Sequence, residues 1–322
     1  MLVLVAPGQG AQTPGFLNPW LDVPGVAERL EWWSAVTGLD LVYYGTKADA
    51  DEIRDTAITQ PLLVASGLVA ALALFPHPGE AFRTIGAAAG HSVGELTAAA
   101  GTGVISAEAA LVLTRERGRA MAAAAAAVDT GMAAVLGGDP EQVLASIEGH
   151  GLTPANINGA GQVVAAGTAE QLAAFAADPP EKARVRPLQV AGAFHTHHMA
   201  SAVDHVGRYA AAISTRAPRT RLLSNADGAV VRDGSEVLRR IVRQIANPVR
   251  WDLCLRTLAE LGTTALIEVP PAGVLTGLAK RALPGVETLA LKTPDDLDAA
   301  RALVERHGTP SPTAPRTARA DR

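Results

Sequence analysis

The segment Gly90-His-Ser-Val-Gly-Glu95 matches the pattern Gly-x-Ser-x-Gly, in which the serine acts as a nucleophile. A short apolar run precedes this segment and a helix-forming stretch follows it. The pattern needs that setting, because a sharp strand-to-helix turn exposes the serine Oγ and small flanking residues let the turn form. The helix N-terminus also brings N–H groups and positive partial charge close to a developing oxyanion. We therefore predict that Ser92 is a catalytic nucleophile.

A nucleophilic serine needs a base, and the segment Val190-Ala-Gly-Ala-Phe-His-Thr-His-His-Met199 is rich in histidine. His195 is our candidate, since it follows the serine in chain order as in hydrolases with this turn. His91, His197 and His198 compete for the role, and we expect His91 to point away from the serine. His195, His197 and His198 also resemble a metal cluster. No Asp or Glu lies nearby to complete or orient such a site, so we predict no metal.

Arg117 lies on the apolar face of a helix that we predict to begin with Ser106 as its N-cap, and Met121 shares that face. A buried guanidinium is costly unless it is paired. The free carboxylate of a substrate would satisfy it in a bidentate manner. An internal ion pair with Glu95 or Glu116 would also satisfy the guanidinium. The residues alone do not decide between a substrate carboxylate and an internal one.

Strands that alternate with helices predict an α/β fold with a parallel sheet. Outside the middle of the chain, we expect strands at 2–6, 85–89 and 266–269, and helices at 60–75 after a break at Pro61, from Ser92, from Ser106, and at 273–282. The middle reads β-α-β-β-α-β, at 132–136, 140–149, 153–158, 162–167, 169–177 and 183–188, which is the ferredoxin-like order.

This order predicts a small domain inserted into a larger one. We expect a hydrolase-like large α/β domain of residues 1–128 and 190–308, and a ferredoxin-like small domain of residues 129–189. Residues 309–322 are rich in Pro, Thr, Arg and Ala, and we expect a disordered tail there.

The bulk composition excludes several classes of protein. Of the 322 residues 48% are hydrophobic, enough for a substantial core, and the net charge of -4 argues against a nucleic-acid binder. Cys254 is the only cysteine, so no internal disulfide forms, which fits a protein of a reducing compartment. We expect the Cys254 side chain to be buried in the protein core. The apolar run at the N-terminus ends at Pro7, so we expect no signal peptide there, and we expect no stretch long and apolar enough to cross a membrane. We predict a soluble cytoplasmic protein.

Several motifs, taken in order, resemble the malonyl-CoA:acyl carrier protein transacylases and the acyltransferase domains of polyketide synthases. The similarity runs from Val5 to about Lys292. The motifs are Pro7-Gly-Gln-Gly-Ala-Gln12, Thr59-Gln-Pro61, Gly90-His-Ser-Val-Gly-Glu95, Arg117, Gly192-Ala-Phe-His195, Asn247-Pro-Val-Arg-Trp251 and Glu268-Val-Pro-Pro-Ala-Gly273. The last motif departs from the Gly-Pro-Gly common in the family, at a place that touches no expected catalytic role.

The resemblance implies a role for each matching residue. Ser92 would be the nucleophile and His195 its base, with the backbone N–H groups of Gln9 and Val93 forming the oxyanion hole. A backbone carbonyl orients the histidine in this family, in place of a carboxylate, and Gln244 matches that position.

The resemblance also implies the acyl preference. Arg117 would bind the malonyl carboxylate, with Gln60 and Met121 lining the same pocket. Phe194 precedes the catalytic histidine, as in enzymes that take malonyl, and would fill the space of an α-methyl group. Val93 likewise resembles the malonyl pattern. A methyl group is worth only ~1–3 kcal/mol of discrimination, so this selectivity is expected to be incomplete.

The implied reaction is a ping-pong transfer of malonyl from malonyl-CoA to the phosphopantetheine thiol of acyl carrier protein, in fatty acid or polyketide synthesis. No cofactor belongs to the enzyme itself, and we expect a monomer. Acyl carrier proteins are acidic, so a local basic patch is expected. The candidates are Arg184 with Arg186, and Lys280 with Arg281.

Three other functions stay open at this point. A serine esterase or thioesterase would use water as the acceptor, would have an acidic residue orienting His195, and would not need Arg117. A nucleotide-binding protein is suggested by Gly8-Gln-Gly10, but Thr13 stands where the dinucleotide fingerprint requires glycine. A non-catalytic docking partner of carrier proteins would not need both Ser92 and His195.

Overall fold

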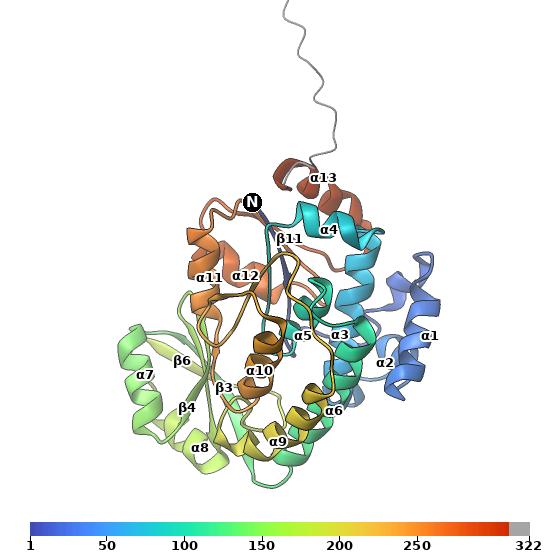
Figure 1. Ribbon diagram of the computed structural model, residues 1–322. Coiled ribbons are helices and arrows are strands. Elements are labelled where there is room, and N and C mark those ends of the chain that lie inside the picture. The colour runs from blue at the N-terminus through green and yellow to red at the C-terminus, as the bar shows by residue number, and fades with distance from the viewer. Residues whose placement is uncertain (309–322) are drawn as a thin grey trace, which may run out of the picture.

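The structure, a computed structural model, describes residues 1–308, so the tail expected at 309–322 lies outside the described residues. A large 6-stranded sheet with the order β11-β10-β1-β2-β7-β8 forms its centre (Figure 1). Neighbouring strands are parallel, except that β8 at the edge is antiparallel to β7. The bounds are β1 Leu2–Ala6, β2 Ala87–Gly90, β7 Arg221–Leu223, β8 Val230–Val231, β10 Ala265–Glu268 and β11 Glu287–Ala290. The predicted α/β class with a parallel sheet is confirmed.

Both faces of this sheet are buried, because successive strand residues point to opposite sides and both sets are apolar. Leu2 and Ile267 belong to one apolar core and Val3 and Leu266 to another. The first core includes residues of α1 Val26–Thr37, α2 Leu41–Thr46, α3 Thr56–Leu74, α5 Gly94–Gly101, α6 Ala107–Ala125, α9 Ala200–Ala211, α10 Gly234–Gln244 and α13 Leu297–His307. The second core includes residues of α11 Trp251–Glu260 and α12 Val274–Ala282.

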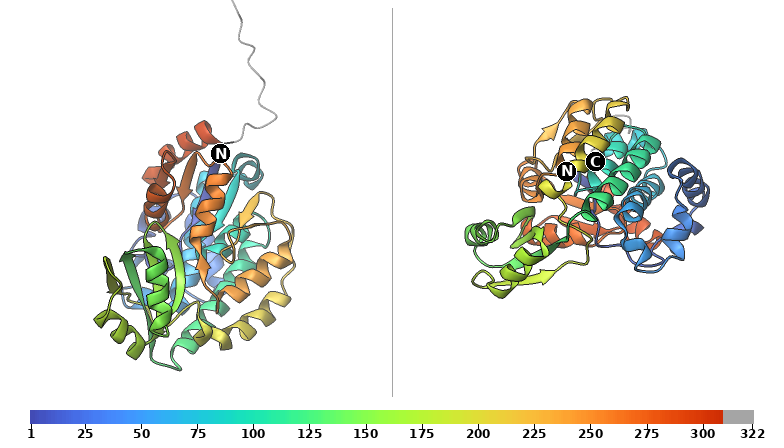
Figure 2. Two further views of the ribbon diagram at one scale, coloured as in Figure 1. Left: turned by 90° about the vertical axis from the view of Figure 1, so that its left-hand side faces the viewer. Right: turned by 90° about the horizontal axis from the view of Figure 1, so that it is seen from below.

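A smaller 5-stranded sheet with the order β6-β3-β5-β4-β9 lies to one side (Figure 2). Its elements are β3 Thr130–Gly137, α7 Pro140–Gly149, β4 Thr153–Gly159, β5 Gln162–Thr168, α8 Ala169–Ala177, β6 Ala183–Pro187 and β9 Val249–Arg250. The order of elements from β3 to β6 fits the expected ferredoxin-like arrangement. Strand β9, which the sequence did not predict, comes from much later in the chain and adds a parallel strand beside β4. The domain boundaries themselves stay a prediction.

The small sheet has one face for its own core and one for the cavity described below. Val135 and Val163 pack with Phe175 of α8 in a separate apolar cluster, on the side that α7 and α8 cover (Figure 1). Met132 and Val164 point the other way, toward the large sheet, and line that cavity. The small sheet thus forms one wall of the cavity.

Helix α3 differs from its prediction in two respects. It begins at Thr56, capped by the Asp55 side chain, which accepts a hydrogen bond from the Ala57 N–H at 2.8 Å. Pro61 therefore lies inside the helix and does not break it. The helix is also long and apolar enough to cross a membrane, contrary to our expectation, but 72% of its most apolar window is buried inside the protein. A helix that is apolar on all sides is typical of a protein core.

Candidate active site

Ser92 occupies the sharp turn between β2 and α5, at the carboxyl end of the central strands. Its φ of 52° lies in the left-handed region, which costs energy for a residue with a side chain. Gly90 and Gly94 flank the serine, and neither position has room for a side chain. A Cβ at Gly94 would lie 2.2 Å from the carbonyl oxygen of Ala6, and one at Gly90 would lie 2.0 Å from the Gly94 backbone. The turn thus matches the one predicted for a nucleophilic serine.

His195 lies opposite the serine, in the segment that follows the small sheet. Its Nε2 is 2.8 Å from Ser92 Oγ, and its Nδ1 is 2.7 Å from the backbone oxygen of Gln244. A carbonyl only accepts hydrogen bonds, so Nδ1 carries the proton and Nε2 is free to accept one from the serine. Burial, reinforced by the charge of Arg117, lowers the pKa of His195 to about 3. The imidazole is therefore neutral at physiological pH and can act as a base.

Arg117 projects from α6 into the same space, and its side chain is almost fully buried, with 1% of the residue exposed. Nη1 donates to Gln60 Oε1 at 2.6 Å, while Nη2 donates to Gln244 Oε1 at 3.1 Å and approaches Ser92 Oγ at 3.4 Å. Burial lowers the pKa of Arg117 to about 10, which leaves it charged at neutral pH. Its hydrogen-bond partners are all neutral oxygens.

The internal ion pair considered for Arg117 is not formed. No carboxylate lies within 4 Å of its guanidinium nitrogens among the described residues, and Nε has no hydrogen-bond partner there. Glu116 points away and pairs with Arg115, Arg119 and His205. A buried cation without a counter-ion in contact is the strongest indication of an anionic ligand at this site.

A polar network behind the reacting groups holds them together. Asn225 Oδ1 accepts from the Ser92 N–H and from Gln244 Nε2, both at 2.9 Å, and its Nδ2 donates to Gly90 O at 2.8 Å. Glu95 accepts from the Asn225 N–H at 2.7 Å. The sequence analysis missed Asn225. Its place beside the serine turn follows from the pairing of β7 with β2, which the sequence analysis did not predict.

These groups line one cavity of about 230 Å³ between the two sheets. It brings together nearly all of the predicted site residues, namely Gln9, Gln60, Ser92, Val93, Arg117, Met121, Phe194 and His195. Gln244 lies behind the wall and acts through its carbonyl and amide oxygens. In the described chain the backbone N–H groups of Gln9 and Val93 donate to no other protein group, as an oxyanion hole requires.

The wall from the small sheet adds polar residues that the sequence analysis did not single out. Asn156, Asn158 and Gln162 all line the cavity. Asn158 Oδ1 is 2.9 Å from His91 Nε2, so His91 ties the serine turn to the small sheet and does not contact Ser92 Oγ. Alternate residues of β4 and β5 point inward, a pattern that becomes informative only once the strand order is known.

The opposite rim comes from α12. Glu268 at the end of β10 is fully buried and accepts hydrogen bonds from the N–H groups of Gly273, Leu275 and Thr276, at 2.8–3.0 Å. A carboxylate at this place satisfies the free N–H groups of the helix start and interacts favourably with its dipole. The capped helix then presents Val274 and Leu275 to the cavity.

Other candidate residues stay outside the site. His197 and His198 stack on each other with ring centroids 4.1 Å apart and do not line the cavity. Within residues 1–308 no group of three His, Cys, Asp or Glu side chains is arranged to hold a metal. Cys254 is buried as predicted, and burial raises the pKa of its thiol.

The chain matches the family model of the acyl transferase domain over residues 3–300. The chain belongs to the acyl transferase family. Two curated acyl transferases, both called malonyl CoA-acyl carrier protein transacylase, are similar over nearly their whole length. The one from Mycobacterium tuberculosis H37Rv is 51% identical over 303 residues, which are 92% of this chain and 98% of the relative. The one from Escherichia coli K12 is 34% identical, with 92% and 97% covered.

Solved acyl transferase structures agree with this fold. The crystal structure of the transacylase from Mycobacterium tuberculosis superposes with a TM-score of 0.90 at 50% identity, covering 94% of this chain and 99% of that one. A malonyl-transacylase solved in complex with the acyl carrier protein of a type II polyketide synthase has a TM-score of 0.85 at 29% identity, with 94% and 99% covered.

Proposed function

We propose that this acyl transferase moves the malonyl group from malonyl-CoA to the phosphopantetheine thiol of acyl carrier protein, through an ester on Ser92. The observation that carries the proposal is the buried guanidinium of Arg117 beside Ser92 Oγ, with only neutral oxygens as partners. A malonyl carboxylate supplies the missing negative charge and can bind the guanidinium in a bidentate manner. Held there, it places the thioester carbonyl next to the serine.

In the first half-reaction His195 Nε2 takes the proton of Ser92 Oγ as the oxygen attacks the thioester carbon. The N–H groups of Gln9 and Val93 stabilise the oxyanion. When the tetrahedral intermediate collapses, the C–S bond breaks and the CoA sulfur leaves with the proton from His195. The product is a malonyl-serine ester, still held by Arg117.

In the second half-reaction the same groups act on a new nucleophile. His195 takes the proton of the pantetheine thiol, the sulfur attacks the ester carbonyl, and Ser92 Oγ leaves with that proton. The enzyme is restored and no cofactor of its own is consumed. Two half-reactions that share one acyl-enzyme give ping-pong kinetics.

We expect an acidic carrier protein to dock beside the opening of the cavity. Leu188, directly after β6, and Val274 of α12 are exposed on two sides of the opening. The basic candidates lie on the same elements, Arg184 and Arg186 on β6 and Lys280 and Arg281 on α12. The solved complex of a related malonyl-transacylase with its carrier protein supports this class of partner. We expect a cytoplasmic monomer.

Intact-protein mass spectrometry after brief mixing with malonyl-CoA tests the proposal, with Ser92→Ala as the control. The wild type is expected to gain one malonyl group and to lose it when holo-acyl carrier protein is added, while the variant gains none. Steady release of free malonate without an adduct would instead make water the acceptor and the chain a hydrolase. Acetyl-CoA, which lacks the carboxylate, is expected to give much less adduct.

A further inference from the structure

Glu95 is a buried carboxyl group that the mechanism above does not use. It lies in the first turn of α5 and is 4% exposed. Oε1 accepts from the Asn225 N–H at 2.7 Å, and Oε2 accepts from Gln244 Nε2 at 2.5 Å. Each oxygen thus accepts a hydrogen bond, an arrangement that suits the ionised form. In the part of the chain that the structure describes, no cation lies within 4 Å of it.

The amide of Gln244 connects Glu95 to Arg117. Its nitrogen donates to Glu95, and its oxygen accepts from Arg117 Nη2 at 3.1 Å. When Glu95 is ionised, the amide dipole is therefore aligned between its negative charge and the positive charge of Arg117. Two buried charges without direct partners stabilise each other across this single group, because the interior screens them weakly.

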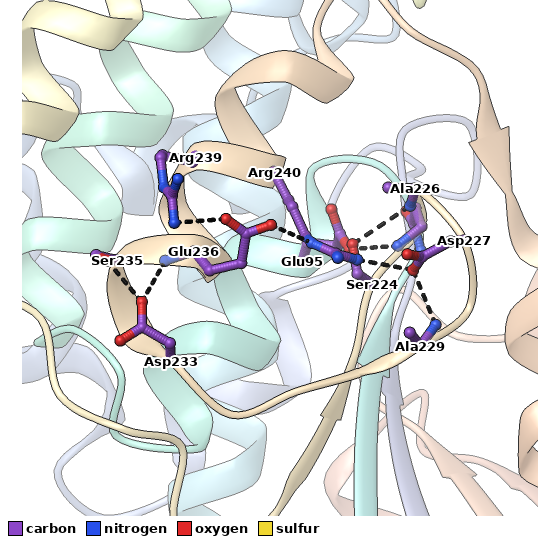
Figure 3. A network of polar contacts seen from close by, with 11 residues as sticks. Glu95, Ser224, Ala226, Asp227, Ala229, Asp233, Ser235, Glu236, Arg239 and Arg240 are labelled. Atoms are coloured by element: carbon purple, nitrogen blue, oxygen red, sulfur yellow. Dashed lines mark hydrogen bonds and ion pairs between the residues drawn. The ribbon is translucent and has the colours of Figure 1, made fainter.

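The surroundings of Glu95 leave Arg117 as its main counter-charge. Apolar residues of β7, β8 and α10 close in on one side: Leu222, Leu223, Val231, Val237 and Ile241. The charged or titratable groups that face it are Arg117 from α6, Arg240 from α10, Asp227 beyond β7, and the Cys254 thiol from α11. Arg240 is held by Glu236 and Asp227, each at 2.7 Å, as the dashed lines of Figure 3 mark.

These influences oppose one another. Burial raises the pKa of Glu95 to about 8, although the Asn225 hydrogen bond and the charges of Arg117 and Arg240 lower it. A carboxyl group poised in this range changes its charge readily when the charge on its partner changes.

We propose that ionised Glu95 is the counter-charge of Arg117 in the empty site, and that a substrate carboxylate replaces it only as Glu95 takes up one proton. The inference rests on the proposed function, since it takes the malonyl carboxylate as the incoming charge. Two carboxylates that share one buried guanidinium leave a net negative charge in the interior, which burial disfavours. Protonation of Glu95 removes that charge.

The exchange balances without any other reactant. Arg117 Nη2 gives up Gln244 Oε1 and binds a carboxylate oxygen of the substrate. The proton comes from solvent and goes to Glu95. The Gln244 amide, released from Arg117, can then turn its oxygen toward the new O–H. Glu95 touches no reacting atom, so it is a positioning residue that couples the charge of the acyl group to the pH.

One consequence is a pH profile that depends on the acyl group. Above pH 8 an ionised Glu95 competes for Arg117, so kcat/KM for malonyl-CoA is expected to fall up to tenfold per pH unit. Transfer from acetyl-CoA, which brings no carboxylate, is expected to show no such fall. In Glu95→Gln, the neutral isostere, the malonyl profile becomes flat between pH 7 and 9. Glu95→Asp keeps a carboxylate and keeps the fall.

The direct test is calorimetry of binding to a Ser92→Ala background, which cannot be acylated, in buffers of different ionisation enthalpy. At pH 8.5 malonyl-CoA is expected to bind with uptake of roughly three-quarters of a proton, the fraction of Glu95 ionised there, and at pH 6.5 with almost none. Parallel titrations with acetyl-CoA and free CoA measure how much of the proton uptake is due to the CoA phosphates. Glu116→Gln, a nearby buried glutamate already paired with cations, is the matched control and is expected to keep the uptake.

The outcomes separate the two proposals. Equal proton uptake for malonyl-CoA and acetyl-CoA at pH 8.5 overturns the role of Glu95, whatever its variants do. Uptake that persists in Glu95→Gln assigns the proton elsewhere and also overturns it. A wild type that forms no malonyl-serine at any pH overturns the proposed function itself. Because the first measurement needs no change at Glu95, a variant that fails to fold leaves the inference testable.

Discussion

Two neighbours on α6, Glu116 and Arg117, are both buried charges, yet their surroundings are opposite. Glu116 faces α9 and meets two arginines and a histidine: Arg115 at 3.0 Å, Arg119 at 3.4 Å and His205 at 3.0 Å. Arg117 faces the cavity and meets only amide and hydroxyl oxygens. One charge is neutralised by the protein, and the other is left for a ligand to neutralise.

The pKa values of the two groups reflect this difference. Burial raises the pKa of Glu116, but the hydrogen bond with His205 and the charges of Arg119 and Arg115 outweigh it and hold the pKa below its ordinary value. Burial lowers the pKa of Arg117 to about 10, and only the charge of Glu95 opposes that shift. The comparison teaches that burial alone does not mark a functional charge. A buried charge without a counter-ion does.

Replacing Arg117 by Ala is expected to have the largest effect. Loss of a buried, charge-assisted contact with the substrate costs about 3–5 kcal/mol, so kcat/KM for malonyl-CoA should fall by about 150- to 5,000-fold. Acetyl-CoA, which makes no such contact, should lose less than about tenfold. Steady-state kinetics with both acyl donors measures the ratio, and Arg115→Ala serves as the control. Equal losses for both donors would contradict the assigned role.

Replacing Gln244 by Ala is expected to have a smaller effect on the same reaction. The backbone carbonyl that orients His195 remains, but Arg117 and Glu95 lose the amide between them. A hydrogen bond to a charged group is worth about 1.5–3 kcal/mol, so kcat/KM for malonyl-CoA should fall by about 10–100-fold. Rapid-mixing measurement of the Ser92 adduct should show slower acylation of an intact serine. An unchanged rate would mean that the amide does not position Arg117.

The stability of the protein is expected to fall as the pH rises from 6.5 to 8. The pKa of Glu95 rises from 4.5 to about 8 on folding, so in this range the folded chain holds a proton that the unfolded chain has released. The pKa of His195 falls from 6.5 to about 3 on folding, so it adds stability with rising pH only below 6.5. The free energy of unfolding should fall by about 1.4 kcal/mol per pH unit, which amounts to about 2 kcal/mol between pH 6.5 and 8. Urea unfolding at several pH values measures it, and Glu95→Gln should remove the decline.

Replacing Glu116 by Gln is expected to have the smallest effect. Its three partners are partly exposed, so water can solvate them when the carboxylate is lost. We expect a loss of about 1 kcal/mol of stability or less, and malonyl transfer within about twofold of the wild type. Thermal unfolding and the standard assay measure both. A loss of activity as large as that of Arg117→Ala would show that the two neighbours are not functionally separate.

The site was predictable where its signal is local. The serine turn follows from small residues at Gly90 and Gly94, between a strand and a helix. The direction of Arg117 follows from the helical period, because Met121 one turn later lies on the same face and reaches the same cavity. The four strands of the β-α-β-β-α-β segment were predicted to within two residues of their observed bounds.

The parts that were missed depend on segments far apart in the chain. Asn225 joins the serine turn, Gln244 and Glu95, yet nothing around it in the sequence marks it as special. Strand β9 adds to the small sheet from a distant part of the chain. The exception is local: Pro61 was taken as a break, although the helix begins earlier at Thr56 and continues through it.

The sequence by itself determined the sharp turn that carries Ser92, the apolar setting of Arg117, and the class of fold, since turn sterics and side-chain periodicity act between near neighbours. Only the tertiary structure decided that Arg117 has no carboxylate in contact and that Glu95 reaches it through one amide. Whether a buried charge is compensated depends on which distant segments the sheet order brings within hydrogen-bond reach. That order is a property of the packed chain and of no single segment of it.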